Sequence, residues 1–351
     1  MSPQRKSTRV TIADVAARAG VSVMTVSRVV NRDDKVKAST RATVEKAIAE
    51  LNYTPNVAAR ALAGGTVRRI CLLYGNPSSA YLGDLLTGAL EAAVDAGVHL
   101  MVERTDPTLD PSALADRLGR DWDAVIVPPP MSDIAGIRTL VRERGFPAVF
   151  LCSATESGRA NEIRIDDRKA AFEMTQCLLE KGHERIGFIQ GHPNQTVSEA
   201  RLTGYQDALD AAGLALDADL IQPGLFNYRS GQLAGATLLD LRDRPTAIFA
   251  SNDDMAAGCL AAAAAAGIQV PEELAIAGFD DSSIASVVWP PLTTLRQPVS
   301  EMAAMAVRTV LALRDGHSQP NTRIVEHTII ERGTTIPRAG NGHADSRTLR
   351  N

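Results

Sequence analysis

The stretch Val10–Asn31, VTIADVAARAGVSVMTVSRVVN, predicts two short helices joined by a glycine corner. Thr11 is placed to cap the first helix, and Asp14, three residues on, suits both a capping box and the positive end of the helix. Gly20 supplies the positive φ that a sharp corner requires. Because Ser22 is placed to cap the second helix, this one stretch specifies both helix starts and the turn between them.

The second of these helices has an apolar side and an outward side. Helical spacing turns Val26, Val29 and Val30 inward. The side chains that point outward are Val23, Met24, Ser27, Arg28 and Asn31. A helix, a tight turn and a second helix with a polar outer side form the helix-turn-helix plan, whose second helix enters the DNA major groove. The alternative is an ordinary helical hairpin.

Charge is distributed unevenly along the chain, and this favours the DNA-binding interpretation. The 351 residues carry a formal net charge of −4 at pH 7. Residues 1–69 hold thirteen Lys or Arg against five Asp or Glu, a net of +8, whereas the rest of the chain holds a net of −12. A basic head on an acidic body places polyanion binding at one end and keeps the body away from DNA.

Two further segments complete the N-terminal region. A helix over Thr40–Leu51 adds the apolar face that three short helices need to close a small core. After it, Asn56–Ala63 predicts a short, alanine-rich helix that lies between a proline and two glycines and has no nearby core. Because an isolated helix of this length is marginal in water, we expect it to order only against a partner.

From Arg68 onward, strands alternate with helices, which is typical of parallel sheets covered by helices on both faces. The predicted strands are residues 68–75, 98–104, 124–130, 147–152, 185–191, 219–225, 246–252 and 274–280. The predicted helices are Tyr81–Gly97, Asp110–Leu118, Ile134–Arg144, Asp167–Lys181, Ser198–Ala212, Tyr228–Leu241 and Met255–Ala266. A helix over Val299–Arg314 and a last strand over Thr322–Arg332 return to complete both halves. These units are too many for one sheet, so we expect two doubly wound parallel sheets that divide near Ile165–Asp167.

The chain therefore divides into several predicted parts. They are an all-α head, 8–55; a hinge helix and linker, 56–67; an α/β body, 68–335; and a disordered tail, 336–351, which is rich in polar residues. Within the body we expect an N-subdomain of about 68–165 and 298–324, and a C-subdomain of about 166–297 and 325–335. The tail contains no leucine heptad, so no coiled-coil assembly is implied.

With these segments described, the chain resembles the lactose-repressor (LacI/GalR) family of transcription regulators. The matching segments are TIADVAARAGVS and TVSRVVN in the head, then LNYTPN (51–56), ARALAGG (59–65), SNDDMAAG (251–258) and AGFDD (277–281). The match runs from about Val10 to Thr335. It implies a body of two subdomains with a ligand cleft between them, like a periplasmic sugar-binding protein. It also implies a homodimer that binds a palindromic operator in double-stranded DNA under the control of a small effector.

Several residues of the head are candidates for DNA contact. Arg28 suits bidentate contact with guanine, and Val23 and Met24 are placed to touch base edges or thymine methyls. In the family, the positions that match Val23 and Met24 choose the operator. The candidates for phosphate contact are Thr11, Ser22, Thr25, Asn31 and Lys35, with Ser27 on the same outward side. For these residues the alternative is simple helix capping or a solvated surface.

Leu62 is the sharpest single prediction. In the family, the matching leucine of the hinge helix inserts through the minor groove into a central CpG step, and such a wedge kinks DNA. Asn56 and Ala59 lie on the same element, and Ala59 is small enough to let the backbone approach the groove. The alternative is that Leu62 packs on the body as a linker residue.

The effector candidates follow predicted strands, where open α/β sheets bind their ligands. They are Tyr81, Asp166, Arg201, Phe226, Asn252, Asp253 and Asp280. The resemblance implies that Arg201, Asn252 and Asp280 bind sugar hydroxyls or a ligand carboxylate. Tyr81 and Phe226 are placed to stack on a sugar, although such aromatics are more often core residues. Cys152 stands where many sugar-binding members have an aspartate, so we expect a sugar or a sugar-derived acid without assigning which.

Other classes of protein find less support. The four cysteines have neither a CxxC pair nor zinc spacing, the six histidines form no ligand pattern, and no nucleotide loop, HExxH or GxSxG motif occurs, so we expect no cofactor, metal or catalysis. The basic N-terminus runs into no apolar segment, so we expect no secretory signal and no membrane contact. A solute-binding receptor of a transporter and a sugar-active enzyme are the competing interpretations. We expect instead a repressor of carbohydrate-use genes in the bacterial cytoplasm, at the nucleoid.

Overall fold

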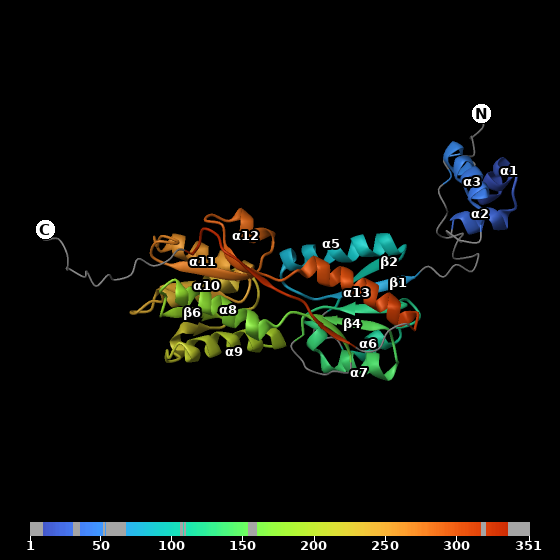
Figure 1. Ribbon diagram of the computed structural model, residues 1–351. Coiled ribbons are helices and arrows are strands. Elements are labelled where there is room, and N and C mark those ends of the chain that lie inside the picture. Colours follow the sequence, from blue (N-terminus) through green and yellow to red (C-terminus); the bar gives the residue numbers. More distant parts are fainter. Residues whose placement is uncertain are drawn as a thin grey trace, which may run out of the picture. The chain divides into compact units, whose positions relative to one another are not determined.

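The structure is a computed structural model that describes residues 10–30, 36–51, 53, 68–105, 108, 110–153, 160–316 and 321–335. The chain divides into two compact units, Met1–Arg68 and Arg69–Asn351 (Figure 1). The predicted hinge and tail lie outside the described residues, and so do the DNA-contact candidates Asn31, Lys35, Asn56, Ala59 and Leu62.

The first unit contains the three predicted head helices: α1 (Ile12–Ala19), α2 (Val23–Val30) and α3 (Ala38–Glu50). The predicted capping box is confirmed, because Thr11 and Asp14 exchange side-chain and backbone hydrogen bonds at the start of α1. Gly20 ends α1 with φ 67°, which is the left-handed conformation expected at the corner. Ser22 Oγ accepts a 3.1 Å hydrogen bond from Thr25 N, so Ser22 caps α2 as predicted.

A small apolar core joins the three head helices. Val15 of α1, Val26 of α2 and Val44 of α3 are completely buried and pack in one cluster. In contrast, Val23 and Met24 at the start of α2 remain 46% and 64% exposed. The apolar spacing along the helices thus sets which side of α2 packs inward and which side faces solvent.

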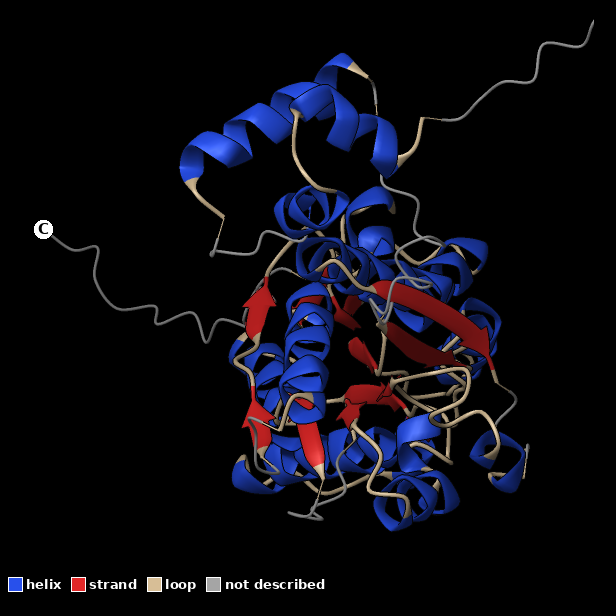
Figure 2. Cartoon of the chain, turned by 90° about the vertical axis from the view of Figure 1, so that its right-hand side faces the viewer, coloured by secondary structure: helices blue, strands red, loops and turns tan. Residues whose placement is uncertain are grey.

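The N-terminal lobe of the second unit is built on a six-stranded parallel sheet in the order β11-β5-β4-β3-β1-β2. Figure 2 shows the strands inside a layer of helices. The strands are β1 (Arg69–Tyr74), β2 (His99–Arg104), β3 (Ala124–Val127), β4 (Ala148–Leu151), β5 (Asn161–Arg164) and β11 (Thr322–Ile324). The helices are α5 (Ser79–Ala96), α6 (Ser112–Ala115), η1 (Met131–Asp133), α7 (Ala135–Glu143) and α13 (Val299–Arg314).

Helices α5 and α13 pack closely at Gly88. A Cβ at this position would lie 1.8 Å from the Ser300 carbonyl oxygen, so only glycine permits the approach. Ser300 Oγ also donates a 3.0 Å hydrogen bond to the Asp84 carbonyl oxygen on α5. Contact between these two helices therefore fixes α13, which follows the C-terminal lobe in the chain, on the N-terminal lobe.

The C-terminal lobe has a second six-stranded sheet in the order β12-β10-β9-β8-β6-β7, parallel except for the β10–β12 pair. Its strands are β6 (Ile186–Ile189), β7 (Ile221–Gln222), β8 (Ala247–Ala250), β9 (Ala275–Asp280), β10 (Thr293–Arg296) and β12 (Thr328–Ile330). Its helices are α8 (Asp167–Glu180), α9 (Thr196–Ala211), η2 (Ala218–Leu220), α10 (Tyr228–Leu239), α11 (Asp253–Ala265) and α12 (Ser283–Val287). The two doubly wound sheets that the sequence predicts are thus confirmed.

Three sequence predictions need correction. The last strand is not one element, because residues 325–327 separate β11 in one lobe from β12 in the other. The predicted helix Asp110–Leu118 shrinks to Ser112–Ala115, since Leu118 instead bridges to the buried Trp122. The predicted strand 219–225 shrinks to Ile221–Gln222 because Pro223, which has no N–H to donate, follows at once.

Candidate functional site

A pocket lies between the two lobes at the carboxyl ends of their strands, where open α/β sheets bind ligands. The N-terminal lobe contributes side chains from the loops after β1, β3 and β4, and the C-terminal lobe contributes loops after β6, β7, β8, β9 and β10. The lining residues are Asn76, Ser78, Tyr81, Pro129, Cys152, Gln195, Val197, Arg201, Phe226, Asn252, Asp280 and Gln297. Amides, hydroxyls and one carboxylate therefore converge on this pocket from both sheets.

Arg201 is the most constrained side chain of the lining. Its Nε donates to Asp167 Oδ1 at 2.8 Å, and its Nη1 donates to the Ser251 carbonyl oxygen at 2.5 Å. The guanidinium also lies over the rings of Phe279, 3.5 Å from the centroid, and Phe226, 5.7 Å away. With its rotamer fixed on every side, Arg201 presents a pre-organised cation to the pocket.

A chain of side-chain hydrogen bonds crosses the pocket between the lobes. Tyr81 Oη donates to Cys152 Sγ at 3.3 Å in the N-terminal lobe. Cys152 Sγ donates in turn to Gln297 Oε1 at 3.9 Å, and Gln297 Nε2 donates to Asp280 Oδ1 at 2.5 Å. Burial raises the pKa of Asp280 to about 7, although the Arg201 charge opposes this shift. Burial also raises the pKa of the Cys152 thiol to about 12, so this thiol is a neutral donor.

Backbone strain is concentrated in this pocket. Cys152, Phe226 and Asp280 all have positive φ, at 47°, 55° and 111°, although none is glycine. All three side chains line the pocket. Non-glycine residues in this region are held there only by surrounding structure, and they cluster at binding sites. The strain therefore marks these three strand ends as a functional site.

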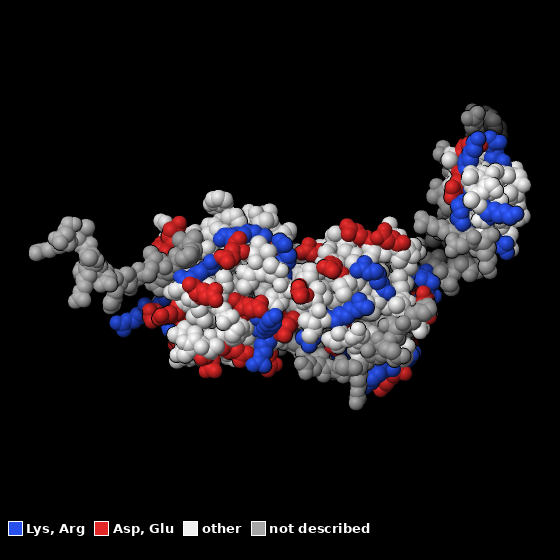
Figure 3. All heavy atoms as spheres, viewed as in Figure 1, with Lys and Arg blue, Asp and Glu red and all other residues white. Residues whose placement is uncertain are grey.

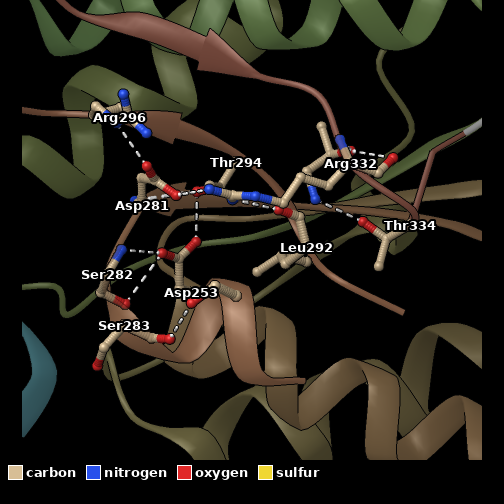
Figure 4. Close-up of polar contacts among 11 residues, drawn as sticks. Asp253, Asp281, Ser282, Ser283, Leu292, Thr294, Arg296, Arg332 and Thr334 are labelled. Carbon is tan, nitrogen blue, oxygen red and sulfur yellow. Dashed lines mark hydrogen bonds and ion pairs between the residues drawn. The ribbon is translucent and has the colours of Figure 1, made fainter. Parts of the chain in front are cut away.

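Asp253 does not reach the pocket, contrary to the prediction from sequence. Figure 4 shows its carboxylate at the start of α11, where Oδ2 accepts hydrogen bonds from Ser282 N at 2.8 Å and Ser282 Oγ at 3.1 Å. Oδ1 accepts a third hydrogen bond from Thr294 Oγ1 at 2.5 Å. These contacts tie α11 to the loop after β9 and to β10, so the Asp253 carboxylate is used within the C-terminal lobe.

Asp281, which follows Asp280 in the same loop, is held by two arginines. Its two carboxylate oxygens accept hydrogen bonds from Arg296 Nε and Arg332 Nη2, each at 2.6 Å (Figure 4). Arg332 Nη1 also donates to the Leu292 carbonyl oxygen at 2.9 Å. Through Arg332 the returning C-terminal segment is fixed to the loop that carries Asp280.

Asp166 is also not a lining residue. Its carboxylate accepts a 3.0 Å hydrogen bond from Lys169 N and caps α8, so it is used in local structure. The adjacent Asp167 instead faces inward and pairs with Arg201. Asp166 and Asp167 are adjacent at the start of α8, and the helix phase decides which carboxylate lies near the pocket. The spacing of residues in the sequence does not resolve a difference of one position.

The head presents the other candidate surface. Arg28 and Met24 lie exposed on α2, and Lys and Arg side chains are visible on the head in Figure 3. Thr11 and Ser22 both cap helices, which is the role that the sequence analysis gave as the alternative to phosphate contact. Thr25 Oγ1 lies 2.9 Å from Ser22 Oγ. Phosphate contact by these residues stays a prediction.

Comparison with known proteins now decides the family. Residues 11–56 match the model of bacterial regulatory proteins, lacI family, and residues 175–335 match a periplasmic binding protein-like domain. The HTH-type transcriptional regulator GalR of Escherichia coli (strain K12) is 34% identical over 326 residues, which cover 92% of this chain and 94% of GalR. The chain belongs to the lacI family of bacterial regulatory proteins.

Solved structures agree with this assignment. A lac repressor dimer bound to operator and the anti-inducer ONPF matches with a TM-score of 0.77 and 27% identity, covering 94% of this chain and 100% of that one. A complex of the transcriptional regulator CelR with cellobiose matches with a TM-score of 0.70 and 29% identity, covering 93% and 100%. This lacI-family protein is therefore a DNA-binding transcriptional regulator, and the alternative of a transporter receptor is set aside.

Sequence reasoning found some of the pocket of this lacI-family regulator and missed other parts. Tyr81, Arg201, Phe226, Asn252 and Asp280 all line it, as predicted from their places after strands. The predictions did not include the lining residues Asn76, Ser78, Gln195 and Gln297. The strand-end rule would have included Asn76 and Ser78, but Gln297 follows β10, a strand that the sequence analysis did not predict.

No group of three or more His, Cys, Asp or Glu is arranged to hold a metal ion in the described ranges. Within that same part of the chain, no helix is both long enough and apolar enough to cross a membrane.

Proposed function

We propose that this regulator is a dimeric repressor of carbohydrate-use genes whose effector, an uncharged sugar, binds between the two lobes. The observation that carries the proposal is the convergence of polar side chains from both sheets on one strained pocket. Each sugar hydroxyl both donates and accepts hydrogen bonds, and amides, hydroxyls and carboxylates together satisfy both roles. We further propose that the protein works in the bacterial cytoplasm, at the nucleoid.

The charges around the pocket favour a neutral sugar over a sugar-derived acid. Arg201 and Asp280 are the charged side chains of the lining, and Asp167 already pairs with Arg201. The pocket therefore has no unmatched positive charge for a ligand carboxylate, and Asp280 would repel one when ionised. The relative solved with cellobiose carries a neutral sugar, which supports the same class of ligand here.

The apolar surface supports a dimer. In the N-terminal lobe, Leu90 and Val94 of α5 lie 48% and 77% exposed, and Met101 and Val102 of the edge strand β2 are also exposed. In the C-terminal lobe, Val287 and Trp289 beside α12 are 77% and 87% exposed. Large exposed apolar side chains mark interaction surfaces when they gather in a patch. We propose that this surface pairs two copies about a two-fold axis, as in the lac repressor dimer solved with operator.

Two-fold symmetry in turn implies a palindromic operator. We propose that Arg28 reads guanine, that Val23, Met24 and Ser27 face base edges, and that Thr11, Ser22, Thr25, Asn31 and Lys35 contact the backbone. The hinge residues Asn56, Ala59 and Leu62 would then enter the minor groove at the centre. Effector binding changes how the N-terminal lobes meet across the dimer, and operator affinity changes with it.

The decisive experiment titrates the purified full-length protein against a labelled palindrome from its own promoter region. The palindrome carries a central CG step, and salt is varied with and without cellobiose, lactose, galactose and ribose. We expect tight binding. The logarithm of the association constant should fall with the logarithm of salt concentration, with a slope of about 0.9 per neutralised phosphate. One neutral sugar should change operator affinity, and operator must change the affinity for that sugar by the same factor. Equal sugar affinity with and without operator would contradict the proposed coupling.

A further inference from the structure

A carboxylate of the N-terminal lobe holds the start of a helix in the C-terminal lobe. Asp133, at the end of η1, accepts a 3.1 Å hydrogen bond on Oδ2 from Thr196 N. Its Oδ1 accepts a 2.8 Å hydrogen bond from Thr196 Oγ1 and a 2.7 Å hydrogen bond from Ser153 Oγ. Ser153 follows β4 in the N-terminal lobe, so it orients Asp133 from the same side. Two charge-assisted hydrogen bonds thus join the lobes directly.

This contact replaces the cap that α9 lacks. Thr196 is the first residue of α9, and the N-cap residue Gln195 makes no side-chain capping bond. Four other long helices of the unit are capped by the residue just before them, namely Ser78 for α5, Asp166 for α8, Asn227 for α10 and Asn252 for α11, whereas α13 begins after Pro298 without such a bond. A carboxylate at a helix N-terminus satisfies free N–H groups and the helix dipole. The start of α9 is therefore complete only while the lobes are together.

The contact adjoins the pocket without lining it. Gln195 and Val197, on either side of Thr196, line the pocket, and Arg201 lies on the same helix, but Asp133 and Thr196 do not line it. The cavity between the lobes has a volume of about 30 Å³. Sites for small ligands occupy roughly 300–1,000 Å³. A sugar therefore enters only when the lobes separate, and separation breaks the Asp133–Thr196 contact.

We propose that Asp133 is a latch that holds the empty cleft closed and so limits the rate at which the effector enters. The inference rests on the proposed function, in which the effector binds between the lobes. Because the cavity of about 30 Å³ is too small for a sugar while the contact is formed, the latch stabilises the empty closed cleft and not the occupied one. Removing it should therefore speed association, lower the effector Kd by the same factor and leave the dissociation rate nearly unchanged.

Asp133→Ala tests the latch, and Asp110→Ala is its matched control. The Asp110 carboxylate accepts hydrogen bonds from Ser112 N at 2.9 Å and Ser112 Oγ at 2.7 Å, the same pair of donor types. Both residues of this second pair lie in the N-terminal lobe, so its loss breaks no contact between lobes. Thr196→Val removes one of the two interlobe hydrogen bonds while keeping the backbone N–H, and it serves if Asp133→Ala does not fold.

The first measurement needs no ligand. In full-length Asp133→Ala, the rate of hydrogen–deuterium exchange of backbone amides should rise about tenfold in residues 193–199. It should also rise in the distant cleft loops at 76–82 and 280–284. Faster exchange on both sides of the cleft shows that the lobes separate more often. Faster exchange confined to residues 193–199 would mean that Asp133 is only a local cap, and it would overturn the latch. Asp110→Ala should leave all three segments unchanged.

The second measurement follows binding by stopped-flow tryptophan fluorescence with the neutral sugar identified in the operator experiment. We expect the association rate constant to rise about tenfold in Asp133→Ala and by less in Thr196→Val, while the dissociation rate constant stays nearly unchanged. A defect in folding alone would lower the fraction that binds without accelerating association. An unchanged association rate constant would overturn the latch. If none of the four sugars binds, the proposed effector class fails, whereas the exchange experiment still decides the latch.

Discussion

Arg201 and Asp167 form a buried ion pair in which Nε and Nη2 of Arg201 both lie 2.8 Å from Oδ1 of Asp167. The side chains are only 4% and 3% exposed. The pair joins the first residue of α8 to α9, and so fixes the cation that faces the effector cleft.

Asp167→Ala should strongly destabilise the C-terminal lobe. Removing one partner leaves a buried, uncompensated charge on Arg201, and such losses cost about 3–5 kcal/mol. Thermal unfolding measures the change. The control is Asp207→Ala, which removes the neighbouring exposed pair Arg168–Asp207 and should cost at most about 1 kcal/mol. Equal effects of the two substitutions would contradict the role assigned to the buried pair.

Asp280→Asn should make the protein more stable at pH 8 than the wild type and less sensitive to pH. The pKa of Asp280 rises from an ordinary value near 4 to about 7 in the folded protein. Between these values the folded state binds more protons than the unfolded state, so wild-type stability falls as pH rises through this window. The loss amounts to at most about 4 kcal/mol.

Melting temperatures at pH 5 and pH 8 test this prediction. Asparagine tolerates the positive φ of 111° at this position and retains an oxygen to accept from Gln297. Asp110→Asn is the control, because hydrogen bonds from Ser112 lower rather than raise the pKa of Asp110. A variant whose melting temperature changes with pH as much as that of the wild type would contradict the assignment to Asp280.

Arg28→Lys should weaken operator binding by about 1–3 kcal/mol and relax selectivity for one guanine, with little change in binding to unrelated DNA. Lysine keeps the charge but loses the planar fork that matches guanine O6 and N7. Fluorescence anisotropy with operator and scrambled duplexes measures both affinities. Arg18→Lys is the control, because Arg18 pairs with Glu50 within the head at 2.5 Å. Equal losses on both duplexes would assign Arg28 to phosphate contact instead.

Leu62→Ala should weaken operator binding and reduce DNA bending. An apolar wedge in the minor groove kinks DNA by roughly 20–90°, and alanine is too short to unstack a base step. Energy transfer between dyes at the two ends of the operator reports the bend. The variant Leu62→Met keeps the bulk and should retain most of the kink. If the bend and the affinity of Leu62→Ala matched the wild type, Leu62 would be a linker residue.

Local chemistry alone determined the head. The capping pair Thr11 and Asp14, the corner at Gly20 and the cap at Ser22 act within a few residues of one another, so their sequence spacing fixes their structure. The strand–helix alternation likewise predicted two sheets, because a fully buried parallel strand needs an apolar run, but it missed the strands β5 and β10. The strand-end rule then brought Arg201, Asn252 and Asp280 to the pocket.

Contacts between distant segments decided the rest. Helix phase decides that Asp167 rather than Asp166 reaches Arg201. Loop packing decides that the Asp253 carboxylate accepts hydrogen bonds from Ser282 and Thr294. Residues 325–327 split one predicted strand between two lobes, although an apolar pattern does not record which sheet a strand joins. The contact between Asp133 and Thr196, 63 residues apart, exists only because folding brings the lobes together. Sequence therefore determines each element and its strand-end chemistry, whereas tertiary structure decides which polar groups are used internally and which remain for the effector.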